Sequence, residues 1–199
     1  MEITPRKELK IVAILGSAQQ SSMTSEVFKF VQNEIEKHSE IKLEIIDPTD
    51  LDLRVPGKGS TNDAREIERL VREADGVILA TPEYHGSYSS TIKLVIDNLG
   101  FPSALSGKPV SLLGVAAGQI GAIKALEHLR SVASHVGGLV LAGPVSVAGV
   151  RSAFDENGAF KDVRVEKMVR SVATSLLDYL DSFVCPKMAL EEMARQAAA

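Results

Sequence analysis

Short apolar runs alternate with helical patterns from one end of the chain to the other. Residues 9–16 (LKIVAILG) and 76–82 (GVILATP) are nearly continuous apolar runs, as in central parallel strands that helices cover on both faces. Residues 24–38 change to a helical period, which places four apolar side chains on one stripe: Val27, Phe28, Val31 and Ile35. The alternation predicts an α/β fold, a doubly wound five-stranded parallel sheet with helices on both faces.

The remaining elements follow from the same two periods. Further strands are predicted at 42–48, 108–118 and 137–149, and the first of these alternates, so it is expected at a partly exposed edge. Further helices are predicted at 63–75, 90–100, 121–135 and 162–183. The helix at 121–135 should turn four side chains inward: Ile123, Leu126, Leu129 and Val132. We expect Pro82 to end the third strand and the Ala-rich end of the chain to fray.

Composition narrows the class of protein. With 199 residues, 45% of them hydrophobic, the chain can bury one good core, so we expect a single domain over 1–199 with peripheral or flexible tails at about 1–8 and 186–199. The net charge of −4 and the lack of a basic cluster argue against nucleic acid, and no apolar run is long enough for a membrane span. Cys185 is the only cysteine, which excludes an internal disulfide and a cysteine-based metal cluster. We expect a cytoplasmic protein without a metal site.

In an open parallel sheet, ligands bind beyond the carboxyl ends of the strands, so the loops there are the candidate sites. The loop after the first strand, GSAQQSSMTSE (16–26), offers several hydroxyls where a helix begins, which suits a phosphate. It has neither the GxGxxG pattern of dinucleotide-binding folds nor the GK[ST] ending of a P-loop. The alternative is simple helix capping by Ser22 or Thr24.

Two later loops are equally unusual. After the third strand, TPEYHGSYSS (81–90) combines an aromatic ring at Tyr84, a histidine at His85 and a glycine at Gly86 that allows close approach to the backbone. His85 acts either as an acid or base or only in packing and hydrogen bonding, and no nucleophile accompanies it. After the fourth strand, AAGQIGA (116–122) leaves room beside the next helix, whose positive end would stabilise an electron-rich ring.

Together these loops resemble the NADPH-dependent FMN reductases with a flavodoxin-like fold, a family of chromate, quinone and azo-dye reductases. That family carries GSxRxxSxN in the first loop, where this chain has GSAQQSSMT, and PEYNxSxPgxLKNaiD in the second, where it has PEYHGSYSSTIKLVID. GQIGAIKALEHLR and AFDENGAF are similar to the family's later segments. The resemblance implies that a flavin occupies the crevice above the sheet.

Carried over position by position, the resemblance implies thirteen FMN contacts. The phosphate and ribityl chain would lie on the first loop, the isoalloxazine on the second, and its other edge on the third: Ser17, Gln19, Ser22, Met23 and Thr24; Pro82, Glu83, Tyr84, His85 and Gly86; Ala116, Ala117 and Gly118. Gln19 stands where the family has Arg, His85 where it has Asn, Ser89 and Ser90 where it has Pro-Gly, and Leu94 where it has Asn.

The implied activity is hydride transfer from NADPH or NADH to FMN and reduction of a small acceptor: a quinone, a flavin, an azo compound or chromate. No side chain need act as an essential base, because the flavin supplies the chemistry. The family implies a homodimer or homotetramer, and Arg54 and Arg151 are candidates for contacting the 2′-phosphate of NADPH. The alternatives are a flavodoxin-type electron carrier and a flavin-free module that binds a phosphorylated ligand.

Overall fold

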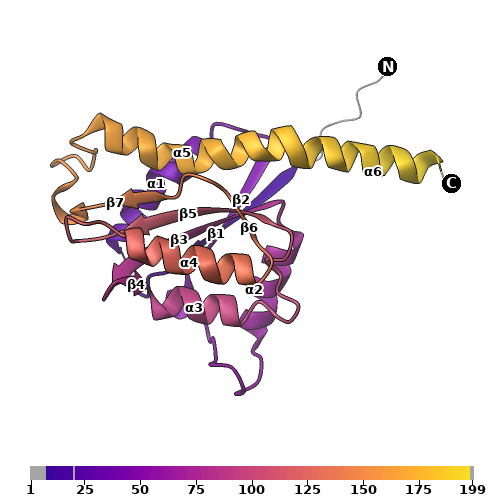
Figure 1. Cartoon of the computed structure of the whole chain (residues 1–199), viewed down its shortest axis with the longest axis horizontal. Helices are drawn as coiled ribbons and strands as arrows, with labels where there is room; N and C mark the ends of the chain where they lie inside the picture. The colour runs from indigo at the N-terminus through magenta and orange to yellow at the C-terminus, as the bar shows by residue number, and fades with distance from the viewer. Residues whose placement is uncertain (1–7, 20, 198–199) are drawn as a thin grey trace.

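The computed structural model describes residues 8–19 and 21–197 and contains the predicted parallel sheet (Figure 1). Five parallel strands follow the spatial order β2-β1-β3-β5-β6, with bounds Ile41–Ile46, Leu9–Leu15, Gly76–Tyr84, Pro109–Val115 and Leu139–Val140. The chain starts at the centre, moves to one edge and returns to build the other half, which is the doubly wound pattern. The fold class predicted from the alternation is therefore confirmed.

Helices cover both faces of the sheet. One face packs under α1 (Met23–Ile35) and α5 (Val163–Tyr179), and the other under α2 (Asn62–Glu73), α3 (Ser90–Asp97) and α4 (Ile123–His135). The apolar stripe predicted for the first helix is fully buried on α1. Because β1, β3 and β5 lie between two apolar layers, nearly every residue in them is buried, which explains their continuous apolar runs.

The third strand runs further than its sequence suggests. β3 passes through Pro82, which pairs in register with Val115 of β5, and then forms a short hairpin with β4 (Ser87–Tyr88). The prediction that Pro82 ends this strand is wrong: the pairing with β1 ends at Ala80, so at Pro82 β3 has a neighbour on one side only, where a proline is tolerated. The extension carries the loop of residues 85–86 beyond the sheet edge.

The predicted fifth strand at 137–149 is two strands. β6 pairs with the start of β5 and β7 (Val145–Val147) with its end, so the two occupy successive halves of one position in the sheet. Gly143, with φ of 74°, and Pro144, without an N–H, interrupt the ladder between them.

The last helix continues past its predicted end. α5 passes into a π-helical turn, η3 (Leu180–Val184), and then into α6 (Cys185–Ala197), which extends beyond the rest of the molecule (Figure 1). Pro186 explains the wider turn, because a proline clashes with the carbonyl four residues earlier in a regular α-helix. None of the helices within the described ranges has both the length and the apolar character needed to cross a bilayer.

Candidate functional site

The three candidate loops meet at one edge of the sheet. β1, β3 and β5 are parallel neighbours, with Leu15 paired to Ala80 and Pro82 to Val115 near their carboxyl ends. The loops that follow these strands therefore lie side by side, together with the starts of α1, α3 and α4 (Figure 1, left-hand end). All thirteen residues carried over from the family pattern lie in these loops, at the strand ends beside them or in the first turn of α1.

The first loop presents buried hydroxyls where α1 begins. Ser22 caps the helix by accepting a hydrogen bond from the Ser25 N–H at 3.1 Å, and Ser17, Ser22 and Thr24 are 3%, 6% and 1% exposed. The N–H groups of Met23 and Thr24 have no acceptor among the described residues, as expected for a first helical turn. The side chain of Gln19 is exposed beside them. Ser22 thus caps α1, and the N–H groups of Met23 and Thr24 remain as neutral donors at the positive end of the helix dipole.

The second loop is a tight hairpin turn with its own internal support. His85 and Gly86 both adopt positive φ, 51° and 78°, as the central residues of a two-residue hairpin turn do. The carboxylate of Glu83 accepts a hydrogen bond from the Gly86 N–H and closes the turn. Tyr84 and His85 are exposed at the tip. Glu83 therefore holds the turn, and Tyr84 and His85 present their side chains outward.

The third loop is held by the turn that follows β7. The N–H of Ala116 donates to Val147 at 2.8 Å, and the N–H of Gly149 donates to the carbonyl of Gly118 at 3.0 Å. A Cβ added at Gly118 would meet no atom within 4 Å, so its backbone faces open space. Hydrogen bonds to β7 and the turn after it thus fix this loop on one side, and the space beside Gly118 on its other side is open.

α4 begins differently from the other main helices. Ser22, Thr61, Ser89 and Asp162 cap α1, α2, α3 and α5 with their side chains, whereas the described residues provide no side-chain cap for α4. Just before the helix, the Ala122 N–H donates to the hydroxyl of Ser146 at 2.8 Å. The start of α4 thus leaves further N–H groups directed at the crevice edge.

Ser89 joins the first two loops, and sequence reasoning missed this. Its hydroxyl donates to the carbonyl of Gly16 and accepts from the Ile92 N–H at 3.1 Å, while its own N–H donates to the hydroxyl of Thr81 at 3.1 Å. In the sequence, Ser89 stands out only as a departure from the family's Pro-Gly. A serine just before a helical pattern indicates a cap, but its partner 73 positions away gives no local signal.

Exposed apolar side chains surround the loops. Met23, Tyr84, Ile120 and Ile123 are 36%, 49%, 83% and 52% exposed, and they come from all three loops and from α4. The prediction that Ile123 faces inward is wrong: it is the first residue of α4, where the helix has not yet turned its apolar stripe onto the sheet. Ile120 was not a predicted site residue. Exposed apolar groups on neighbouring loops indicate a binding surface.

The two candidate phosphate-binding arginines occupy different places. Arg54 lies in the loop after β2, pairs with Asp52 at 3.4 Å, and its carbonyl is bound by Asn98 at the end of α3. Arg151 lies two residues after Gly149, whose turn anchors the third loop, and has no ion pair within the described part of the chain. Only Arg151 is adjacent to the candidate site.

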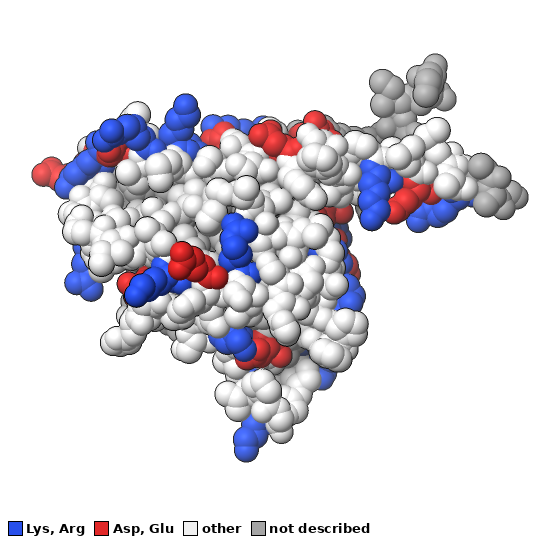
Figure 2. All heavy atoms as spheres, viewed as in Figure 1, with Lys and Arg blue, Asp and Glu red and all other residues white. Residues whose placement is uncertain are grey.

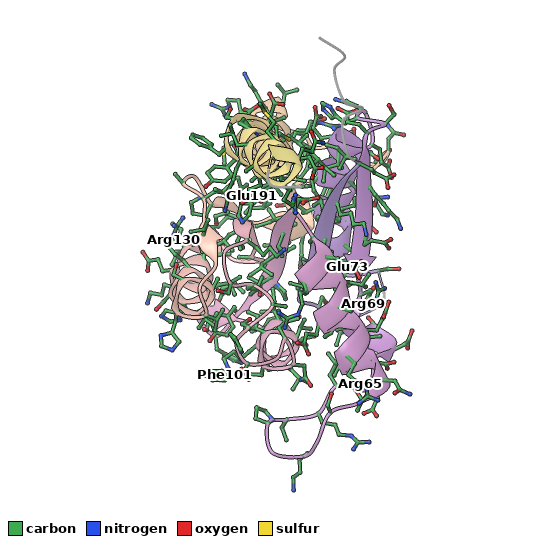
Figure 3. The ribbon with its side chains drawn as sticks, turned by 90° about the vertical axis from the view of Figure 1, so that its right-hand side faces the viewer. Arg65, Arg69, Glu73, Phe101, Arg130 and Glu191 are labelled. Atoms are coloured by element: carbon green, nitrogen blue, oxygen red, sulfur yellow. The ribbon has the colours of Figure 1, made fainter. Side chains whose placement is uncertain are left out.

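A network of surface charges lies away from these loops. Arg69 on α2 binds Glu66 and Glu73, and its hydrogen bonds lower the pKa of both carboxyl groups, while Lys10 adds to the effect on Glu73 (Figure 3). This network stabilises the outer surface of α2 and the start of β1. Within residues 8–19 and 21–197, no three His, Cys, Asp or Glu side chains are placed to hold a metal ion.

Comparison with known proteins gives a consistent result. The model of a family described as NADPH-dependent FMN reductase matches residues 9–151. An FMN-dependent NADPH-azoreductase of Staphylococcus aureus (strain USA300) is 30% identical over 184 residues, covering 88% of this chain and 95% of the relative. Among solved structures, an NADH:FMN oxidoreductase (EMOB, apo form) has a TM-score of 0.68 at 26% identity, covering 84% of this chain and 90% of its own. The flavoenzyme NAD(P)H:(acceptor) oxidoreductase FerB of Paracoccus denitrificans has a TM-score of 0.73 at 22% identity, covering 87% and 97%.

Proposed function

The chain belongs to the NADPH-dependent FMN reductase family, and we propose that its FMN binds across the three loops at the carboxyl edge of the sheet. The enzyme is an FMN-dependent NAD(P)H oxidoreductase, as the sequence motifs predicted. The observation that carries the placement is the convergence of three loops, each with open backbone or hydroxyl groups, at one sheet edge.

The first loop fits the phosphate end of FMN. Ser17, Ser22 and Thr24 offer hydroxyls at the start of α1, and the N–H groups of Met23 and Thr24 lack acceptors among the described residues. A phosphate at a helix N-terminus is stabilised by such donors and by the helix dipole. Gln19 supplies one neutral amide where the family has a guanidinium, so the phosphate is held without a bidentate ion pair.

The second and third loops fit the ring. Pro82 and Glu83 support a turn whose tip presents Tyr84, His85 and Gly86, while Ala116, Ala117 and Gly118 form the opposite wall. Small residues on this wall leave room for a flat group, and the space in front of Gly118 is open. The start of α4 stabilises negative charge developing at the near edge of the ring.

The residues of the three loops would hold FMN, which would supply the redox chemistry between the nicotinamide and the acceptor. The residues of this chain position the phosphate and the ring, and none of them acts as an essential acid or base. Arg151, rather than Arg54, is the proposed contact for the 2′-phosphate of NADPH, because it follows the turn that anchors the third loop.

The acceptor we propose is a flat aromatic compound, an azo dye or a quinone. Met23, Tyr84, Ile120 and Ile123 make the surroundings of the loops apolar, which favours an aromatic ring over an inorganic oxyanion such as chromate. The Staphylococcus relative is named as an azoreductase, which agrees with this choice. A cytoplasmic location and assembly as a homodimer or homotetramer belong to the same proposal.

Reconstitution and reduction test the proposal. The apoprotein is titrated with FMN by the quenching of flavin fluorescence, and the complex is then mixed anaerobically with NADPH in a stopped-flow instrument. We expect one FMN per chain, direct bleaching of the flavin band by NADPH, and reoxidation by an azo dye or a quinone faster than by chromate. A bound flavin that NADPH does not bleach would indicate an electron carrier, and failure to bind FMN would refute the site.

A further inference from the structure

The C-terminal helix extends from the molecule and leaves an open groove beneath it. α6 continues the axis of α5 past the ends of the strands, and Figure 2 shows the hollow between α6 and the body on the right. The groove measures about 1200 Å³. Its upper wall is the underside of η3 and α6, and its floor is the amino edge of the sheet, including Leu9, Pro109 and Leu139. It lies at the end of the sheet opposite the candidate flavin site.

The stability of α6 depends on what it packs against. It continues α5 through η3 and so needs no new nucleus, but helices in proteins are stabilised mainly by packing of an apolar face, and most described side chains of α6 are exposed. Its own ion pairs, Lys187 with Glu191 at 3.8 Å and Arg195 with Glu192 at 3.1 Å, are exposed and so contribute little to its stability. The helix therefore needs a packing partner.

The apolar side chains of α6 indicate where that partner packs. Leu190 and Met193 are 66% and 61% exposed, and Phe183, on the π turn that leads into α6, is 62% exposed. Three residues at four-residue spacing form a stripe along one side of the helix: Cys185, Ala189 and Met193. Such a stripe on an extended helix is buried when a second element lies along it.

We propose that the partner is a second copy of this chain, and that two copies exchange α6 helices, each helix lying in the groove of the other. A helix that extends beside a groove is self-complementary under a two-fold axis, the commonest symmetry of homo-oligomers. Figure 3, which views α6 nearly end-on, shows Glu191 on the side of the helix that faces the sheet.

Charge and sequence agree with this pairing. The described part of α6 carries two positive and two negative side chains, so two copies meet without net repulsion: Lys187, Arg195, Glu191 and Glu192. An antiparallel pair whose two-fold axis passes at the level of Ala189 sets Lys187 of each copy opposite Glu191 of the other, on the side of α6 that faces the groove. Cys185, Ala189 and Met193 lie on the opposite side of the helix, where the exchange places the floor of the partner's groove. Unlike charges are thus matched between the two helices.

The area that the exchange of α6 helices would bury is large enough for a stable dimer. A helix of 13 residues is about 20 Å long and about 10 Å wide, so half of its circumference covers roughly 300 Å². The groove wall that each helix covers loses a similar area, and the two-fold axis doubles the sum. The exchange therefore buries roughly 1,200 Å² in total, which reaches the range of stable protein interfaces.

Paired charge substitutions test the exchange. The variant Leu190→Glu/Met193→Glu places charge in the proposed interface, and Val163→Glu/Met168→Glu is its matched control, because both control residues are exposed apolar groups on a helix. Mass is measured by sedimentation over a range of protein concentrations. We expect the first variant to have half the mass of the wild type, with a dissociation constant raised at least about a hundredfold, and the control to keep the wild-type mass.

Hydrogen exchange on the wild type supplies a second measurement that needs no variant. Amides of α6 should be protected at high protein concentration and exchange rapidly on dilution, because only the assembled helix has a partner. A wild-type monomer at all concentrations, an unchanged mass in the L190E/M193E variant, or protection of α6 independent of concentration would each overturn the exchange. The last two results are those expected if the groove is filled from within the same chain.

Discussion

Replacing Ser89 with alanine tests how the candidate site is held together. The side chain is 1% exposed, and its hydroxyl both caps α3 and donates to the carbonyl of Gly16 in the first loop. Loss of an N-cap costs about 1 kcal/mol. Leaving the buried carbonyl of Gly16 without this donor costs about 1–3 kcal/mol more. We therefore expect S89A to lower the free energy of unfolding by about 2–4 kcal/mol, measured by urea denaturation of the apoprotein.

Thr61 offers a matched control for this substitution. It caps α2 by accepting from the Ala64 N–H at 3.1 Å and donates to the carbonyl of Asp52 at 2.5 Å, so T61A also removes a cap and a second hydrogen bond. Thr61 lies outside the three loops, at the end of the loop after β2. T61A should destabilise the protein by about 1–3 kcal/mol and leave the dissociation constant of FMN unchanged.

The difference between the two variants is the informative quantity. If the Ser89–Gly16 bond keeps the first two loops in their binding geometry, FMN binding to S89A must restore that geometry. A cost of about 1 kcal/mol weakens binding roughly fivefold. Flavin fluorescence titration measures this directly at a temperature where both variants are folded. An FMN affinity in S89A equal to that of T61A would refute the reasoning, since the bond would then contribute to stability alone.

Three further predictions address the crevice wall, the dinucleotide and acid stability. In Gly118→Leu the new side chain enters open space, so the free energy of unfolding of the apoprotein should stay within about 0.5 kcal/mol of the wild-type value. The same side chain should abolish FMN binding in the fluorescence titration, and retained binding would show that the ring lies elsewhere. Arg151→Ala should raise KM for NADPH about tenfold, as expected for loss of about 1.4 kcal/mol, and leave KM for NADH unchanged, whereas Arg54→Ala should change neither. Hydrogen bonds from Lys37, and then from Arg170, lower the pKa of Glu34 below its ordinary value. The ionised carboxylate therefore stabilises the folded protein at neutral pH, and this stabilisation is lost as the pH falls through the lowered pKa. Glu34→Gln should lower the free energy of unfolding by about 1 kcal/mol at neutral pH and not at all in strong acid, and an equal loss at both pH values would contradict the assignment.

The parts of the fold that sequence predicts are those where one physical requirement acts along a continuous segment. β1, β3 and β5 lie between two helical layers, so burial imposes an apolar residue at almost every position and the run is visible. The split of the fifth strand was missed because its two halves pair with different ends of β5, which no local pattern records. The continuation through Pro186 was missed because a π turn absorbs the proline.

The same distinction, between features with a local sequence pattern and features that depend on distant contacts, holds for the candidate site. Its three loops were found because topology alone places the carboxyl ends of parallel strands together. The roles of Ser89 and Ser146 were not found, because each binds a loop far from it in sequence. Ile120 was passed over because an isoleucine in a glycine-rich loop reads equally as packing or as exposure, and only the fold decides between them.

The substitution of His85 for the family's asparagine has a conformational explanation. The turn places residue 85 at φ of 51° and residue 86 at 78°, so the first position needs a residue that tolerates the left-handed region and the second is met by glycine. Asparagine, aspartate and histidine are the non-glycine residues enriched there, whereas a β-branched residue is strained. Glu83 then closes the turn through the Gly86 N–H whichever of the three is present. The exchange of Asn for His therefore preserves the backbone that faces the proposed ring, and it follows from turn geometry without any proton-transfer role for the imidazole.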